Sequence, residues 1–365
     1  MVKIKLGDLC VPSAGQIKED AEELIDYFDI SSVDNETKKV TGFQTMSFGE
    51  SPSRARKAVK KGSILVSTVR PNLNAVALLE EDTPNISVAS TGFCILDCKE
   101  NVDNRFVFSF CKSKPFIDAM VSQATGASYP AVSDKIVRAA LVPKYTYEEQ
   151  CNISETLDKV SNVIDSRKAE LSALDDLIKA RFVEMFGDPI LNSKGFNTNA
   201  LKDVLMLKAG DFTAASDISE EKIGRNKYPC YGGNGIRGYV AEYSQEGEYS
   251  LIGRQGALSG NIQYVKGKFK NTEHALLVTP IVEMNNIWLN QLLINLELKR
   301  YQTGAAQPGL SVKNLQEIPI ISVSIADQDR FADFVAQVDK SKAAVQKALD
   351  ETQLLFDSLM QEYFG

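Results

Sequence analysis

Basic side chains are the residues of this sequence whose type and spacing best suit binding chemistry. Five of the nine residues from Ser53 to Lys61 are Lys or Arg, a density that fits phosphate binding or a solvated surface turn. Arg70 follows a predicted strand at 64–69, and Arg254 follows one at 249–252. Each arginine could read a guanine edge through its forked guanidinium, or could form a structural ion pair.

Further polar residues join these candidates. Gln255 beside Arg254 could read adenine. Lys266 and Lys268 alternate with Lys270 along a predicted strand, and their charged row would face phosphate or solvent. The full set of DNA-binding candidates is Arg54, Arg56, Lys57, Arg70, Arg254, Gln255, Lys266 and Lys268.

Signatures of catalysis and metal binding are missing from the sequence. His274 is the single histidine, which excludes histidine triads and histidine-ligand metal sites. No P-loop and no Pro-Pro-aromatic methyltransferase tetrad occurs. The segment from Gly233 to Gly238 formally matches GxGxxG, but a turn-rich stretch follows it instead of a helix, so a tight turn is predicted. The six cysteines form no CxxC pair and are expected to be reduced.

An internal repeat is the strongest signal in the chain. Residues 125–135 (TGASYPAVSDK) match residues 303–313 (TGAAQPGLSVK) at an offset of 178, which continues without a gap to the Phe-Gly pairs at 186–187 and 364–365. Thirteen of these 63 paired positions are identical, against about four expected for unrelated sequences of average composition. Upstream, residues 5–10 loosely match 200–205, and 63–79 loosely match 249–265. The chain therefore contains two copies of one arrangement. Each copy has a module that differs between the copies, followed by a register-locked tail (125–187 and 303–365), which aligns without a gap.

The register-locked tails predict two long helices. Residues 147–186 and 325–364 contain no internal Gly or Pro, and their apolar residues alternate at spacings of three and four, as in a coiled-coil seam. Because each helix alone would expose its seam, an antiparallel pair with one module at each end is the simplest solution. The predicted helix-pairing core consists of Val160, Leu171, Ile178, Val338, Leu349 and Phe356.

The modules are predicted to be α+β. Strands are expected within 62–80 and 250–266, hairpins or loops within 228–249, and helices at 105–122 and 285–301. The fold class is thus α+β, with two globular modules separated by paired antiparallel helices in a pseudo-two-fold arrangement. The expected domains are 1–146 (module), 147–187 (helix), 188–324 (module) and 325–365 (helix).

The acidic charge lies mainly outside the modules. The chain has a formal net charge of −7, but residues 1–124 carry 15 basic and 17 acidic side chains, residues 198–304 carry 12 and 11, and the remainder carries 14 and 20. This distribution suits modules that touch phosphates and helices that touch protein. No apolar stretch approaches the length of a membrane span or signal peptide, so a cytoplasmic location is expected.

The order of these features resembles the DNA-specificity subunits of type I restriction–modification systems. The second copy contains YPCYGGNGIRGYV at 228–240, LIGRQGALSGNIQYV at 251–265, TGAAQPGLS at 303–311 and Gln328. The first copy contains VRPNLNAVAL at 69–78, TGASYPAVS at 125–133 and Gln150. One departure is Tyr129, which stands in the first copy where the second has Gln307 and where the family often has Gln.

The resemblance implies a non-catalytic, sequence-specific DNA-binding subunit. Each module would be a target-recognition domain that reads one half of a split site in double-stranded DNA. The helices would form a spacer that binds two methyltransferase subunits, and a restriction subunit can also join. S-adenosylmethionine, ATP and magnesium would belong to those partners, and this chain would hold no cofactor or metal.

Two alternatives make different demands on the chain. A coiled-coil protein-interaction adaptor would bind no DNA in a sequence-specific way. A metal-dependent nuclease would need carboxylates that hold magnesium, and the cluster of Asp34, Glu36 and Lys38 occurs in one copy only.

Overall fold

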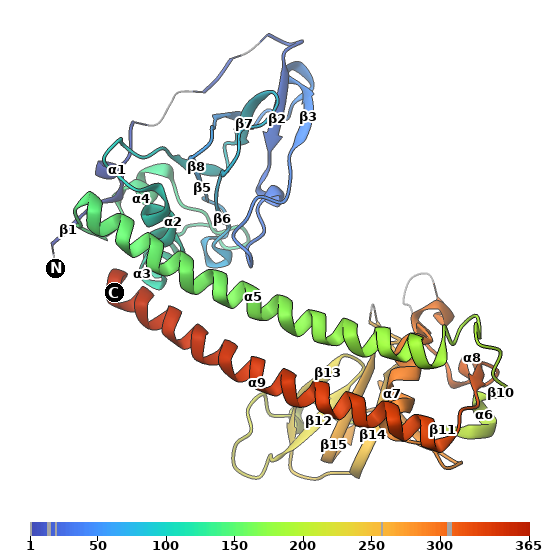
Figure 1. The fold of residues 1–365 in the computed structure, drawn as a ribbon. Coiled ribbons are helices and arrows are strands. Elements are labelled where there is room, and N and C mark those ends of the chain that lie inside the picture. Colours follow the sequence, from blue (N-terminus) through green and yellow to red (C-terminus); the bar gives the residue numbers. More distant parts are fainter. Residues whose placement is uncertain (1, 13–15, 19, 257, 305–308) are drawn as a thin grey trace. The chain divides into compact units, whose positions relative to one another are not determined.

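The chain folds into two compact units joined by two long helices. The computed structural model describes residues 2–12, 16–18, 20–256, 258–304 and 309–365, so Gln307 lies outside the described residues. Unit 1 comprises Met1–Lys168 and Ala348–Gly365, and unit 2 comprises Ala169–Lys347. Helices α5 (Tyr147–Phe186) and α9 (Ile325–Phe364) each contribute to both units (Figure 1). Both helices have the predicted bounds.

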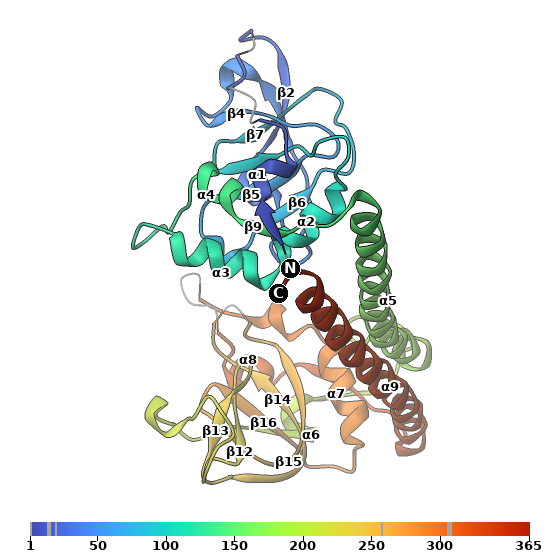
Figure 2. The ribbon, with the colours of Figure 1, turned by 90° about the vertical axis from the view of Figure 1, so that its left-hand side faces the viewer.

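Unit 1 contains two sheets and a short strand pair. The four-stranded sheet has the order β3-β2-β7-β4, and the three-stranded sheet has the order β6-β5-β8. Figures 1 and 2 show the three-stranded sheet in the middle of unit 1. The four-stranded sheet lies on one side of it, and helices α2 and α3 lie on the other. The strands are β1 Lys3–Lys5, β2 Leu24–Phe28, β3 Gln44–Ser47, β4 Ala55–Ala58, β5 Ile64–Ser67, β6 Val76–Leu78, β7 Ile86–Ser90, β8 Phe93–Leu96 and β9 Leu141–Pro143. The α-helices before α5 are α1 Leu6–Leu9, α2 Asn104–Lys112, α3 Lys114–Gln123 and α4 Asp134–Ala139.

Unit 2 is built on a larger sheet of six strands in the order β11-β16-β14-β15-β12-β13. Helix α7, with buried Trp288 and Leu292, packs in one core with α5, α9 and strand β16. Figure 2 shows α7 between the sheet and α9. The elements are β10 Thr198–Ala200, α6 Leu201–Val204, β11 Leu205–Ala209, β12 Tyr228–Gly232, β13 Gly235–Val240, β14 Gln245–Gly253, β15 Ile262–Asn271, β16 Ala275–Pro280, α7 Asn286–Asn295, α8 Val312–Leu315 and β17 Pro319–Ile321. The expected α+β class is confirmed.

The duplication is visible as a shared frame around each module. Strand β1 leads into α1 and pairs antiparallel with β9, which precedes α5. Strand β10 leads into α6 and pairs antiparallel with β17, which precedes α9. Ser133 caps α4 and Ser311, 178 residues later, caps α8. Each module is therefore closed at its base by the same elements.

A buried glutamine ties each long helix to its module. The Gln150 side chain accepts a hydrogen bond from the Asp103 backbone N–H (3.1 Å) and donates to the Tyr145 carbonyl (3.1 Å). Gln328 is placed in the same way: it accepts from the Asn285 N–H (2.9 Å) and donates to the carbonyl of residue 323 (2.9 Å). Asp103 and Asn285 cap the module helices α2 and α7, so each glutamine links two helix starts.

Contacts within each unit set the two long helices antiparallel. In unit 2 the end of α5 meets the start of α9, where the Phe182 and Phe331 rings are 5.5 Å apart and Lys342 pairs with Asp175 at 2.6 Å. In unit 1 the Phe364 ring near the end of α9 lies 5.4 Å from Phe106 of α2, in a core that also contains Ile153 and Leu157 near the start of α5. Of the predicted pairing core, Ile178 and Val338 are buried in unit 2, and Phe356 is half-buried against the core of unit 1. The half-buried remainder is Val160, Leu171 and Leu349.

Local elements differ from the prediction at several points. The single helix predicted at 105–122 is two helices, because Ser113 ends α2 and its side chain caps α3 with Pro115 in the first turn. The helix predicted at 285–301 stops at Asn295, and a short 3₁₀ turn follows. The strand before Arg70 ends earlier than predicted, at Ser67. The glycines at 233 and 235 serve the β12–β13 hairpin turn, as predicted.

Candidate nucleic-acid interface

Arg70 lies at a sharp turn directly after the central strand of the three-stranded sheet. Its backbone is left-handed (φ 49°), and its N–H donates to the Pro130 carbonyl at 2.7 Å. Its guanidinium lies 4.9 Å from the centre of the Tyr129 ring, and that ring is 68% exposed. Thr125 and Ala131 bridge the base of the loop that carries Tyr129. The repeat signature therefore forms a loop beside the arginine.

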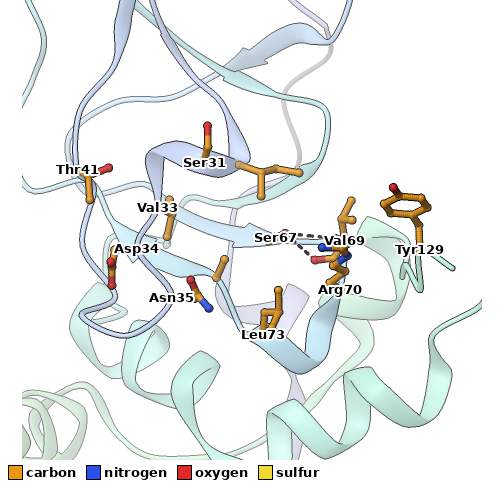
Figure 3. A pocket seen from close by; sticks show the side chains of 12 residues that line it. Ser31, Val33, Asp34, Asn35, Thr41, Ser67, Val69, Arg70, Leu73 and Tyr129 are labelled. Atoms are coloured by element: carbon orange, nitrogen blue, oxygen red, sulfur yellow. Dashed lines mark hydrogen bonds between the residues drawn. The ribbon is translucent and has the colours of Figure 1, made fainter. Parts of the chain in front are cut away.

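A pocket of about 610 Å³ opens beside Arg70 in unit 1. Figure 3 shows Asp34 and Asn35, from the β2–β3 connection, on one side and Arg70 with Tyr129 on the other. Leu73 contributes an apolar wall. The Ser67 hydroxyl donates to the Val69 carbonyl (3.0 Å) and accepts from the Val69 N–H, which holds the chain that leads to the arginine (Figure 3).

Arg254 has the matching position in unit 2. It follows β14, its N–H donates to the His274 carbonyl (3.0 Å), and its own carbonyl accepts from the N–H of Leu310 (2.8 Å). Gln255, which is exposed, bridges Gly309, and Gly309 in turn bridges Thr303. The loop of the repeat signature thus closes beside an arginine in both units. Residues 305–308 of this loop lie outside the described residues.

The hairpin turn between β12 and β13 packs on the strand end that carries Arg254. A Cβ atom at Gly253 would stand 2.1 Å from the Gly233 carbonyl oxygen, so only glycine allows this approach. Close to it, the Nε2 atom of His274 lies 3.1 Å from the Glu273 carboxylate. Buried polar atoms of Arg254 (Nε), Glu273 (Oε2) and His274 (Nδ1) have no hydrogen-bond partner among the described residues. The area around Arg254 is therefore polar, and its hydrogen-bonding capacity is only partly used.

The basic run in and around β4 divides into exposed and structural side chains. Arg54 is exposed. Arg56 lies over the Phe48 ring at 4.9 Å. Lys57 is mostly buried, pairs with Asp134 at 2.6 Å and donates to the Phe93 carbonyl at 2.6 Å. Lys57 therefore links α4 to β8 and stabilises the fold. Arg54 is the side chain of this run that is more accessible to a ligand.

The lysine row on β15 meets a row of glutamates on β14. Lys266 Nζ is 3.5 Å from Glu248, and Lys268 Nζ is 3.7 Å from Glu246, across directly paired positions of the two strands. The pKa of Lys268 is raised by a hydrogen bond with Tyr243 and by the charge of Glu246. Because both lysines are exposed, these pairs stabilise the fold weakly, but they reduce the local positive charge.

Neither a metal site nor a membrane span is found in the parts of the chain that the structure describes. No group of three or more His, Cys, Asp or Glu side chains is placed to hold a metal ion there. None of the described helices combines the length and the apolar character that crossing a bilayer requires. All six cysteines are free thiols.

Comparison with known sequences finds one family. Residues 193–352 match the model of the type I restriction modification DNA specificity domain. The type I restriction enzyme EcoprrI specificity subunit of Escherichia coli is 31% identical over 319 residues, which cover 83% of this chain and 78% of that protein. A putative type I restriction enzyme specificity subunit of Haemophilus influenzae is 36% identical over 95 residues, 25% of each chain.

Comparison with solved structures finds the same fold over the whole chain. A chain from a study of complex assembly and conformational transition of the type I restriction–modification system has a TM-score of 0.62 at 21% identity, covering 100% of this chain and 97% of that one. The type I restriction–modification S subunit from M. genitalium has a TM-score of 0.60 at 19% identity, covering 100% and 96%. At these identities the structures support the fold alone.

Proposed function

This chain belongs to the family of type I restriction–modification DNA-specificity subunits, a non-catalytic subunit class, and we propose that its two modules read the two halves of a bipartite target in double-stranded DNA. The reading surfaces are the arginine turns at Arg70 and Arg254. The target-recognition domains are residues 1–146 and 188–324. The segments 147–187 and 325–365 form the spacer.

A recurring juxtaposition in the two units carries this proposal. In unit 1, Arg70 follows β5, and the loop closed by Thr125 and Ala131 lies beside it. In unit 2, Arg254 follows β14, and the loop closed by Thr303 and Gly309 lies beside it. The neighbouring side chains differ: Tyr129 lies against Arg70, whereas Gln255 and His274 lie near Arg254. A shared arginine in different surroundings suits two readers with different base preferences.

The spacer helices are proposed to recruit two methyltransferase subunits, and a restriction subunit can join the assembly. S-adenosylmethionine, ATP and magnesium are then held by those partners, in the cytoplasm. The acidic balance outside the modules supports a protein-binding role for the helices, because charge repulsion keeps such surfaces from phosphates.

Methylation mapping on the assembled complex tests the proposal. With the methyltransferase subunits supplied, Arg254→Ala is expected to relax base preference in one half-site and Arg70→Ala in the other. A lost bidentate arginine contact removes about 1–3 kcal/mol of discrimination, because the correct base no longer gains its paired hydrogen bonds. The measurement is the methylation rate on DNA libraries with one randomised half-site at a time.

Two results would contradict the proposal in different ways. A uniform loss of methylation on all sequences would make the arginines phosphate anchors, with the bases read elsewhere. No sequence-selective DNA retention by the complete complex would leave the coiled-coil adaptor as the better description. Thermal unfolding of both variants provides the control. Arg70 is exposed, so its loss should leave the fold intact, and the half-buried Arg254 makes the measurement necessary for its variant.

A further inference from the structure

We infer that the pocket beside Arg70 is the base-reading site of unit 1, where Asn35 reads an adenine edge and Arg70 a guanine edge at two positions in the DNA major groove. This inference rests on the proposed function and goes further by naming the reading side chains. Lys38 is a positioning residue that holds the two sides of the pocket at a fixed separation.

The two readers face the same space from separate segments. Asn35 comes from the β2–β3 connection and Arg70 from the turn after β5, and both side chains are exposed (Figure 3). Paired with base edges, an asparagine bonds N6 and N7 of adenine, and an arginine bonds O6 and N7 of guanine. The Tyr129 ring against the guanidinium restricts its orientation, which a bidentate contact requires.

The tip that carries Asn35 is held in one conformation. One carboxylate oxygen of Asp34 accepts from the N–H groups of Glu36 (2.9 Å) and Thr37 (2.6 Å) and from the Thr37 hydroxyl (3.0 Å). These bonds lower the pKa of Asp34, so it is ionised at neutral pH. A carboxylate in the wall of the pocket disfavours a phosphate there and favours the amino groups of bases.

A hydrogen bond fixes the distance between the two sides. The Lys38 ammonium donates to the Asn74 carbonyl at 2.6 Å, and the Asn74 side chain donates to the Cys111 carbonyl at 2.9 Å. The tip of the β2–β3 connection is therefore bound to the turn after Arg70, which is itself bound to α2. Burial lowers the pKa of Lys38 and the charge of Asp34 opposes that effect.

Residues with left-handed backbone lie in the wall of this pocket and in the link beside it. Lys38 (φ 58°), Arg70 (φ 49°) and Asn74 (φ 48°) are three of the five non-glycine residues with positive φ in the described ranges, and the Lys38 bond connects two of them. Such conformations persist where the surroundings over-determine them, commonly at binding sites. The pocket is thus a rigid, pre-formed surface, which lowers the entropic cost of reading a base edge.

Unit 2 has no counterpart of this tip, since the segment of Asp34, Glu36 and Lys38 has no match in the second copy. The pocket therefore affects one half-site only.

The test uses the complex with its methyltransferase subunits and DNA libraries randomised in one half-site at a time. Asn35→Ala is expected to lose preference at one position of one half-site by about 5- to 150-fold, the ratio that corresponds to about 1–3 kcal/mol. Preference in the other half-site stays unchanged. Glu36→Gln, an exposed neighbour that does not line the pocket, is the matched control and retains the wild-type preference.

Lys38→Met separates positioning from reading. It is expected to weaken preference at the Asn35 and Arg70 positions together, with partial rescue in Lys38→Arg, while thermal unfolding verifies that the variant is folded. The inference is overturned if Asn35→Ala keeps every base preference, or weakens methylation equally on all sequences. If the wild-type complex itself shows no two-part target, the proposed function fails first, and the two failures are thereby distinguished.

Discussion

At the scale of single residues, Asp26 is the clearest case of a buried charge held by hydrogen bonds. It lies on β2 and is fully buried. Its carboxylate accepts from the Thr45 hydroxyl (2.7 Å), the Asn85 N–H (2.9 Å) and the Asn85 side chain (3.0 Å). Burial alone would raise the pKa of Asp26, but these hydrogen bonds outweigh that effect and lower it. The carboxylate joins β2, β3 and the chain before β7 in its ionised form.

We therefore expect the stability contributed by Asp26 to depend on pH. A group with a lowered pKa in the folded state stabilises the protein above its ordinary pKa, and this contribution is lost as pH falls through the lowered value. Asp26→Asn should reduce the free energy of unfolding by about 1–3 kcal/mol at pH 7. The difference from wild type should shrink as pH falls below the ordinary value of 3.8.

Urea unfolding at a series of pH values measures this effect. Thr45→Val, which removes one of the three donors, should lower stability less than Asp26→Asn and with the same pH trend. A constant difference between Asp26→Asn and wild type down to pH 2.5 (about a unit below the ordinary value) would show that ionisation of Asp26 is irrelevant to stability.

For single residues, the sequence predicted candidate binding side chains better than it predicted the residues with which those side chains form ion pairs. The repeat was enough to single out Arg70 and Arg254, since the same residue type recurs in matching places. It could not show that Lys57 pairs with Asp134, which lies 77 residues away on α4, or that Lys266 faces Glu248, because that pair depends on the register between β14 and β15. The pocket residue Asn35 was missed because the fold brings it to Arg70 from a separate segment, and its one signal was the turn-forming Asp-Asn pair at 34–35.

At the scale of elements, the long helices were predictable to the residue because their evidence is local. The absence of Gly and Pro, the heptad spacing and the Gly187 exit lie within the segments themselves. The break at Ser113 also had a local signal, Ser followed by Pro at the second position, which is a common helix start. The sheet orders could not be predicted, since the order β11-β16-β14-β15-β12-β13 places β11 beside β16 and β12 beside β15, which are far apart in sequence.

The junction of α5, α7 and α9 gives a prediction at this scale. The Phe186 ring is buried and lies 6.1 Å from Trp288 and 5.8 Å from Phe331. Phe186→Ala should lower the free energy of unfolding by about 3–5 kcal/mol, because it removes buried apolar surface and leaves a cavity. Trp288 is the single tryptophan, so its fluorescence in guanidinium reports on this junction directly.

Leu177→Ala, on the exposed face of the same helix, is the matched control. Its effect should stay within about 0.5 kcal/mol, as is usual for surface positions. Equal effects of the two substitutions would mean that the junction does not hold the helices to unit 2.

At the scale of the whole molecule, the two copies share the elements that frame each module and differ in the sheets of the modules. The glutamine links and the β1–β9 and β10–β17 pairs recur in both copies, whereas the sheets they enclose have different orders. The repeat therefore predicted the frame of the chain, because the frame is encoded twice, but it did not predict the sheets of the two modules. We expect the two long helices, as the proposed spacer, to determine the distance between the two half-sites that the modules are proposed to read.

Shortening the spacer tests that expectation. We expect deletion of residues 170–176 from α5 together with 341–347 from α9 to shorten the tolerated gap in the DNA target. The Asp175–Lys342 pair places these two segments opposite each other, and removal of one heptad from each keeps the apolar seam in register. Each helix becomes about 10 Å shorter, which corresponds to about three base pairs. Methylation of a DNA library with graded gap lengths, in the presence of the methyltransferase subunits, gives the preferred gap.

The control replaces the exposed positions of the same two heptads with alanine and keeps their length, so the preferred gap should stay as in wild type. Deletion from α5 alone should instead impair pairing of the helices, because the seam of α9 would have no matching partner over one heptad. A shortened spacer that methylates the original gap as well as wild type would show that the helices do not set the distance. The two readers would then have to find their half-sites through flexible joints to the frame, which the glutamine links at Gln150 and Gln328 argue against.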